Sequence, residues 1–266
     1  MHIALDARMM GAQNTRGIGR YIEEMIRAVL EVDADIQYTL VVRDLSASPF
    51  VGHPRVDHVA ADIPWYSFRE QLFLSKTLTS IGADVIHIPH WNVPLILRVP
   101  FVITVHDLLL LHEPASAKAS TRGLLVRLAK HAAFRLVLRS ALRRARLIFA
   151  PTQFVATDLE RLANVDHNKI VVTGEGITKF SEVDPSLCST KPFLLYVGSA
   201  YPHKRLDLLL QAWHEIASRH PNHELVIAGE MDAFMEKVKT SSLQSPASSP
   251  VRFLGRVTDA QLAALY

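Results

Sequence analysis

A histidine and an aspartate follow the most apolar strand candidate of the chain, in FVITVHDLLLL at positions 101–111. We expect a strand over 101–105 that brings His106 and Asp107 to its carboxyl end, where parallel sheets bind ligands. A neutral imidazole there can donate a hydrogen bond to a sugar hydroxyl or a carbonyl, so we predict a catalytic role for His106. For Asp107 three roles stay open: capping the next turn, orienting the imidazole, or contacting the ligand directly.

Two cations occur where a later strand meets a helix, in VGSAYPHKRLDLLLQAW at positions 197–213. Gly198 ends the predicted strand, and we expect Lys204 and Arg205 at the N-terminus of a helix over 204–218. Cations there oppose the helix dipole unless an anion compensates them. A pyrophosphate is therefore the predicted ligand, and a solvated basic turn is the alternative.

Glycines open two further loops that follow strand candidates. Gly17 and Gly19 precede a predicted helix in GAQNTRGIGRY, where they would let an anionic ligand approach the backbone and the helix N-terminus. A tight turn without a ligand explains them equally well. Gly255, with Arg256 and Val257, follows the last strand candidate, where backbone groups could contact a nucleobase. By itself this last segment is an ordinary turn between strand and helix.

Short apolar runs alternate with helix-length amphipathic segments along the whole chain, which indicates an α/β protein with parallel sheets. We predict strands at 3–7, 38–43, 56–60, 84–88, 101–105, 147–150, 170–173, 193–197, 225–228 and 251–254. A polar stretch without periodicity covers 174–192 and predicts a domain boundary, so we expect domains over 1–180 and 190–266. Only three strands fall in the second domain, and the chain ends in a helix without a stop signal, so we expect this domain to be incomplete.

The composition excludes several classes of protein. No apolar stretch approaches the roughly 20 residues of a membrane span, and Asp6 and Arg8 interrupt what would be the core of a signal peptide. The single cysteine, Cys188, allows no internal disulfide and has no metal-ligand neighbours. We therefore predict a cytoplasmic protein with no metal site.

A basic segment covers 118–146, with nine Lys or Arg residues and no acid. The members that we assign to one stripe of a helix are Arg127, Arg135, Arg139 and Arg143. A basic amphipathic helix can lie on an anionic membrane, which would place the protein at the inner face of the cytoplasmic membrane with a lipid-linked acceptor. A solvated helix whose apolar side packs on the sheet is the alternative. Nucleic acid is not predicted, since no aromatic residues alternate with the arginines to stack on bases.

Five segments in this order resemble the retaining glycosyltransferases of family 4, which have the GT-B architecture of two Rossmann-like domains. The segments are GIGRY, TVHDL, FAPTQFVATDL, VGSAYPHK and FLGRVTDAQL. The resemblance covers essentially the whole chain. It implies a nucleotide-sugar-dependent hexosyltransferase that acts on a saccharide or lipid-linked acceptor in envelope polysaccharide assembly, such as that of lipopolysaccharide.

The resemblance also implies roles for individual residues. Gly17 and Gly19 would lie against the donor's phosphates, and His106 would contact the transferred sugar. Lys204 would neutralise the departing pyrophosphate without a metal, and 255–257 would sit beside the base. The style of the motifs suggests GDP-mannose as the donor.

Two departures from the family pattern bear on activity. Ser199 and His203 stand where relatives commonly offer an arginine. Family members also continue with two glutamates eight positions apart, a motif that this sequence does not contain, so we expect the 266-residue chain to bind donor weakly and to turn over little. Nucleotide-sugar epimerases and glycogen phosphorylases share the architecture but not the TVHDL and PHK segments. A catalytically dead module, or one half of a split enzyme, is a further alternative.

Overall fold

The computed structural model describes residues 1–266 except 12–16, 33, 113–123, 178–179, 181 and 244–250. The chain forms two compact units, Met1–Gly176 and Ile177–Tyr266. Each is an α/β unit built on a parallel sheet, and every strand predicted from the sequence forms within one residue of its predicted bounds. Apolar runs of four to six residues suit strands that are covered on both faces, because both sets of side chains are then buried.

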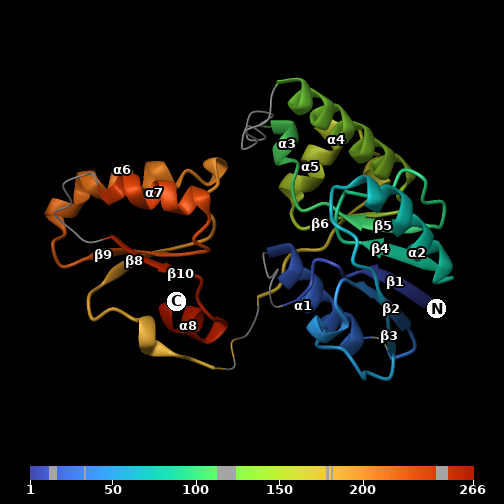
Figure 1. The fold of residues 1–266 in the computed structure, drawn as a ribbon, viewed down its shortest axis with the longest axis horizontal. Helices are drawn as coiled ribbons and strands as arrows, with labels where there is room; N and C mark the ends of the chain where they lie inside the picture. The colour runs from blue at the N-terminus through green and yellow to red at the C-terminus, as the bar shows by residue number, and fades with distance from the viewer. Residues whose placement is uncertain (12–16, 33, 113–123, 178–179, 181, 244–250) are drawn as a thin grey trace. The chain divides into compact units, whose positions relative to one another are not determined.

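The first unit contains a seven-stranded sheet in the order β3-β2-β1-β4-β5-β6-β7 (Figure 1). All neighbouring strands in it are parallel. The strands are β1 (His2–Asp6), β2 (Gln37–Val42), β3 (Val56–Ala60), β4 (Val85–Ile88), β5 (Phe101–Thr104), β6 (Ile148–Ala150) and β7 (Ile170–Val172). The order reverses between β1 and β4, and open α/β sheets bind ligands beyond the carboxyl ends of their strands at such a switch point.

Helices cover both faces of this sheet. Ala4 and Leu5 are neighbours in β1 and point to opposite faces, and they belong to different apolar clusters. The cluster around Leu5 includes Ile22 and Ile26 of α1 (Gly17–Val32). The cluster around Ala4 is built from α2 (Ser75–Ser80), α4 (Leu124–Arg144) and α5 (Gln153–Ala163). The described part of the unit also contains four short helical segments, η1 (Leu45–Ala47), η2 (Glu70–Leu74), α3 (Leu109–His112) and η4 (His167–Lys169).

The basic helix α4 has an exposed face and a buried face, and leucines occur on both. Leu138 and Leu142 are buried in the core. Leu128 and Leu136 are more than half exposed, on the same side of the helix as the exposed Arg135 and Arg139. The basic residues also differ, because Arg144 points inward and donates to the carbonyls of Pro94 and Leu97. The leucines of α4 therefore do not form a single packed side.

The second unit contains a three-stranded parallel sheet in the order β10-β9-β8. Its strands are β8 (Phe193–Val197), β9 (Glu224–Ala228) and β10 (Val251–Gly255), and its helices are α6 (Leu206–Ile216), α7 (Ala233–Leu243) and α8 (Asp259–Leu265). Trp213, 2% exposed, lies at the centre of the core. Thr258 begins α8 with a capping box, in which its hydroxyl accepts from the Gln261 N–H and its own N–H donates to the Gln261 side chain.

The start of α6 corrects the sequence prediction. The helix begins at Leu206 and not at Lys204, which ends a separate helical turn, Pro202–Lys204. Arg205 connects the two with a left-handed backbone (φ 49°), because its N–H closes the turn on the carbonyl of Pro202. Lys204 and Arg205 therefore precede the helix instead of forming its first turn.

Candidate functional site

The switch point of the first unit gathers polar side chains from three strand ends. Arg8 follows β1, His90 follows β4, and His106 follows β5. These strands are neighbours in the sheet, in the order β1, β4, β5. The side chains that follow them therefore share the edge at which a parallel sheet binds ligands.

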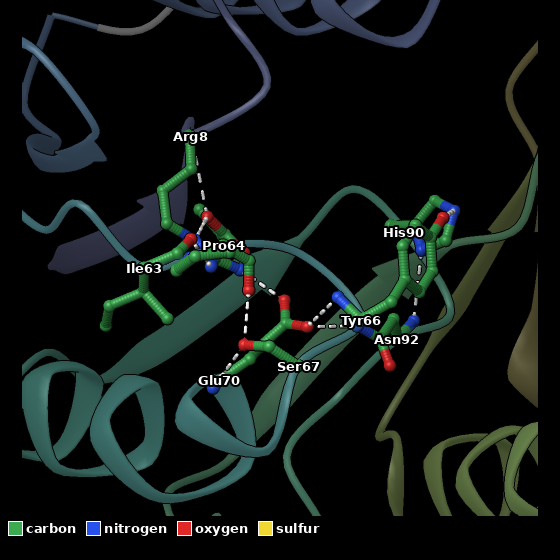
Figure 2. Close-up of polar contacts among 9 residues, drawn as sticks. Arg8, Ile63, Pro64, Tyr66, Ser67, Glu70, His90 and Asn92 are labelled. Carbon is green, nitrogen blue, oxygen red and sulfur yellow. Dashed lines mark hydrogen bonds and ion pairs between the residues drawn. The ribbon is translucent and has the colours of Figure 1, made fainter.

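A buried ionic network holds this edge together (Figure 2). The side chain of Arg8 is 1% exposed, and its Nε donates to Asp6 at 2.7 Å. Its Nη2 donates to Asp6 at 2.8 Å and to Glu70 at 2.7 Å, and its Nη1 donates to the carbonyl of Ile63. Burial alone would lower the pKa of Arg8, but the two carboxylates outweigh it and raise the pKa above its ordinary value.

The second oxygen of Glu70 ties two loops to this network. It accepts from the backbone N–H of Tyr66 and from the side-chain amide of Asn92, both at 2.6 Å. Ser67 adds a link, because its hydroxyl donates to the carbonyl of Pro64 and accepts from the N–H of Glu70 (Figure 2). Glu70 therefore positions the loop after β3 and the loop after β4 relative to each other.

The contacts of His90 determine which ring nitrogen carries its proton. The backbone N–H of Asn92 donates to Nδ1 at 3.1 Å, so Nδ1 is unprotonated. Burial and the neighbouring His106 lower the pKa of His90 to about 4, so the ring is neutral near pH 7. Its one proton is thus on Nε2, which donates to the hydroxyl of Tyr66 at 3.3 Å. The proton of the Tyr66 hydroxyl is left for another acceptor.

His106 is neutral for a similar reason, because burial lowers its pKa. Its Nε2 lies 3.2 Å from the carbonyl of Pro89, which can only accept, so Nε2 carries the proton. The ring of Tyr21 packs edge-on against the imidazole at 4.7 Å. The ring proton is used within the protein in this arrangement, and the catalytic role predicted for His106 stays a prediction. Nδ1 is left to accept a hydrogen bond.

The remaining predicted residues of the first unit lie around the same edge. Asp107 accepts from the N–H of Leu109 at 3.0 Å, so it caps the next turn, as in one of the three roles left open. Gly17 is the first residue of α1 and is exposed, and Gly19 is buried two positions further on. A side chain at Gly17 would meet no atom within 4 Å, so packing does not require a glycine there. The loop at 12–16 lies outside the described residues.

Three glycines line the carboxyl edge of the second sheet. Gly198 and Gly229 follow β8 and β9, and Gly255 ends β10 with a left-handed backbone (φ 71°). Hydrogen bonds continue the sheet between them, from the Gly198 N–H to Ala228 and from the Gly229 N–H to Gly255. A Cβ at Gly229 would lie 2.0 Å from the carbonyl oxygen of Gly198. We call Gly198, Gly229 and Gly255 the glycine edge; all three are half-buried, and Gly229 is a glycine because the backbone of Gly198 packs against it.

The predicted cations of the second unit differ in their contacts. Arg205 is exposed and lies 3.4 Å from the carboxylate of Asp207. Lys204 is exposed, and its ammonium group makes no hydrogen bond or ion pair with the residues that the structure describes; its backbone N–H donates to the carbonyl of Tyr201. Arg256 is exposed and Val257 is half-buried, between the glycine edge and the start of α8. A compensated Arg205 leaves Lys204 as the better candidate for an incoming anion.

The predicted stripe on α4 is described only in part. Arg135, Arg139 and Arg143 are exposed, whereas the side chain of Arg127 lies outside the described residues. Across the described ranges, no helix combines the length and the apolar character of a membrane span. The same residues contain no group of His, Cys, Asp and Glu arranged to hold a metal ion.

Several residues of the site carried no functional prediction from the sequence. Glu70, Tyr66 and His90 were unassigned, and Asp6 and Arg8 counted only as charges that exclude a signal peptide. A usable signal exists for His90, because IPHWN follows β4 directly, as HDL follows β5. Gly229 likewise follows a buried strand directly. No comparable signal marks Glu70, which lies 62 residues from Arg8.

Family models match the sequence over most of its length. A model described as Glycosyltransferase Family 4 matches residues 15–178, and one described as Glycosyl transferases group 1 matches residues 179–266. A search of curated proteins found no match.

Solved structures with this fold include glycosyltransferases and a putative nucleotide-sugar epimerase. WaaG, a glycosyltransferase involved in lipopolysaccharide biosynthesis, has a TM-score of 0.64 at 16% identity, over 100% of this chain and 72% of its own. HepE of Anabaena, solved with UDP, has a TM-score of 0.61 at 18% identity; the match covers 99% of this chain and 71% of HepE. A putative UDP-N-acetylglucosamine 2-epimerase of Listeria monocytogenes has a TM-score of 0.57 at 13% identity; the match covers 99% of this chain and 70% of the epimerase. The two units are thus the Rossmann-like domains of the GT-B architecture, and the second is the shorter.

Proposed function

The chain belongs to glycosyltransferase family 4, and from this premise we propose that it transfers a hexose from a nucleoside-diphosphate sugar to a saccharide or lipid-linked acceptor, with retention of the anomeric configuration. We propose mannose as the hexose and GDP-mannose as the donor. The process would be the assembly of an envelope polysaccharide, in keeping with the lipopolysaccharide biosynthesis in which WaaG is involved. HepE and a further neighbour, MnaA of S. aureus, were solved with UDP, which makes UDP-sugars the first competing donors to test.

The glycine edge is the observation that carries this proposal. The three glycines are half-buried at the carboxyl ends of β8, β9 and β10, and the backbone that they leave without side chains there can be approached by a flat or anionic group. We assign donor contacts to Gly198 and to the segment Gly255–Val257, and phosphate contacts in the first unit to Gly17 and Gly19.

Lys204 supplies the charge that the departing nucleoside diphosphate requires. It is exposed and uncompensated among the described residues, so an anion would gain its full attraction. Arg205 shares its charge with Asp207 and would contribute less. Fixed cations that act where charge develops lower the barrier without a metal. We therefore propose that the reaction needs no metal ion.

His106 would contact the transferred sugar through Nδ1. That nitrogen is unprotonated because the ring is neutral and Nε2 donates to Pro89. It can therefore accept a hydrogen bond from a sugar hydroxyl. Asp107, which caps the next turn, would hold the loop that carries His106.

The exposed face of α4 is the surface that we propose for peripheral membrane contact. Leu128 and Leu136 are exposed there beside the exposed cations Lys130, Arg135 and Arg139. Exposed leucines among cations suit the boundary between lipid headgroups and acyl chains. A lipid-linked acceptor would be reached from such a position.

A donor screen tests the proposal. The wild-type chain, Lys204→Ala and Lys237→Ala are incubated with GDP-mannose and with a panel of UDP-sugars, and the release of nucleoside diphosphate is measured. We expect slow release with one donor, because the sequence predicts weak donor binding and little turnover by this chain, and a loss in kcat of about 100-fold in Lys204→Ala, the usual size for a group that stabilises developing charge. Lys237 is exposed on α7, so its variant should match the wild type. Donor binding without release would instead support the catalytically dead module.

A further inference from the structure

We infer that Tyr66, His90 and Trp91 form a binding platform for a pyranose ring of a saccharide, outside the donor contacts assigned above. These three residues are called the aromatic platform below. The assignment of that saccharide as the acceptor rests on the proposed function, whereas the binding of a sugar ring does not.

The three rings are in mutual contact. The ring centroids of Tyr66 and Trp91 are 5.8 Å apart, those of Tyr66 and His90 are also 5.8 Å apart, and those of His90 and Trp91 are 4.8 Å apart. Phe134 of α4 packs edge-on behind Trp91 at 4.7 Å. Tyr66 is nevertheless 63% exposed, and His90 and Trp91 are half-buried. Aromatic surface of this extent is ordinarily buried, and its exposure at a sheet's ligand-binding edge indicates a binding surface.

Polar groups around the rings match the edge of a sugar. His90 donates its Nε2 proton to the Tyr66 hydroxyl, so that hydroxyl can donate its own proton outward. Desolvation and the nearby carboxylates of Glu70 and Asp107 raise the pKa of Tyr66 to about 12, which keeps the proton in place near pH 7. Pyranose rings present C–H groups on a face and hydroxyls at the rim. Exposed aromatic faces with a directed hydroxyl are complementary to both, whereas an acyl chain would leave the hydroxyl without a partner.

The platform is held in place before any ligand arrives. Tyr66 has a left-handed backbone (φ 56°), which is unfavourable for a residue with a side chain. Glu70 maintains it by accepting from the Tyr66 N–H, and Asn92, which follows Trp91, donates to the same carboxylate oxygen (Figure 2). Both halves of the platform are thus fixed to the buried Arg8–Glu70 pair. A surface prepared in this way loses little entropy when it binds.

Saturation-transfer NMR on the full chain tests the inference without a donor. The probes are the methyl and octyl glycosides of glucose and mannose, and the variants are Tyr66→Phe, Tyr66→Ala and the control Phe68→Ala. Phe68 is 92% exposed on the same loop, and no described residue forms a ring contact with it. We expect saturation of the sugar-ring protons in the wild type and in Phe68→Ala. Tyr66→Phe loses one hydrogen bond, so its glycoside binding should weaken about threefold to tenfold. Tyr66→Ala should show no binding. Unchanged thermal unfolding of Tyr66→Phe keeps the test independent of folding.

Three results would overturn the platform: no saturation in the wild type, equal saturation in Tyr66→Ala, or saturation confined to the octyl chain. The donor screen reports on the proposed function separately. If glycoside binding depends on Tyr66 but the chain consumes no nucleotide sugar, the aromatic platform is supported and the proposed function is contradicted. If the chain transfers sugar and Tyr66→Ala leaves the acceptor KM unchanged, the proposed function is supported and the platform is contradicted as the acceptor site.

Discussion

The guanidinium of Arg8 and the carboxylate of Glu70 meet at 2.7 Å, and only 1% of each side chain is exposed. Removing one partner of a buried pair leaves the other charge without compensation, which typically costs about 3 to 5 kcal/mol. We predict a loss of this size in the free energy of unfolding of Glu70→Ala, measured by urea denaturation. The exposed pair Arg27–Glu23 provides the control, and Glu23→Ala should cost about 0.5 kcal/mol or less. Equal costs in the two variants would show that Glu70 does not hold the switch point together.

The limits of prediction from the sequence follow from the range of the interactions. Strands were placed within a residue because each apolar run is a local signal, and His106 was singled out because it follows such a run directly. The Arg8–Glu70 pair joins positions 62 residues apart, and neither residue signals the other locally. The exposed Leu128 and Leu136 could not be told from the buried leucines of α4 by residue type, because leucines occur on both faces of the helix. The start of α6 depends on one left-handed residue, Arg205, whose type does not favour that conformation.

The buried histidine of β4, His87, should make the stability of the protein depend on pH in the acid range. His87 is 8% exposed, and its Nε2 contacts the hydroxyl of Thr104 at 2.9 Å. Burial, with a smaller effect of His106, lowers the pKa of His87 to about 4 from its usual 6.5. A lowered pKa in the folded state means that the unfolded chain binds more protons between these values. Stability is therefore present above pH 6.5 and is lost as the pH falls towards 4.

We predict that His87→Gln flattens this pH dependence by up to about 1.4 kcal/mol per pH unit, the limit for one proton. Thermal or urea unfolding across the acid range measures it. His167→Gln is the contrasting variant. The protonated ring of His167 donates a hydrogen bond to Glu160, which raises the pKa of His167, so its contribution is present below pH 6.5 and is lost as the pH rises. An unaltered acid slope in His87→Gln would mean that other groups cause the loss.

The close approach of Gly229 to Gly198 predicts a severe effect for one methyl group. A Cβ at Gly229 would lie 2.0 Å from the carbonyl oxygen of Gly198 and 3.1 Å from the end of Met235. Because backbone cannot move aside as a side chain can, Gly229→Ala should cost about 3 kcal/mol or more. Gly17→Ala is the matched control, since its Cβ would meet nothing within 4 Å. Its unfolding free energy should stay within about 0.5 kcal/mol of the wild type.

The same Gly17→Ala variant separates a ligand contact from a folding requirement. If Gly17 lies against the donor's phosphates, the added methyl group prevents the close approach of the backbone. We predict that donor affinity falls about tenfold while stability is retained, the equivalent of about 1.4 kcal/mol in binding. Isothermal titration with the donor identified by the screen measures the change. Unchanged affinity would assign Gly17 to the turn alone.

The exposed face of α4 predicts charge-dependent binding to anionic membranes. Arg135 and Arg139 are exposed beside Leu136, so their guanidinium groups can reach lipid phosphates while the leucine enters the interface. Each cation near such a surface contributes about 1 kcal/mol, so Arg135→Gln with Arg139→Gln should weaken binding about 30-fold. Co-sedimentation with vesicles that contain phosphatidylglycerol measures this, and Lys76→Gln with Arg161→Gln is a control with two exposed cations on other helices. Equal losses in the two double variants would indicate attraction by net charge alone and would remove α4 as the specific contact.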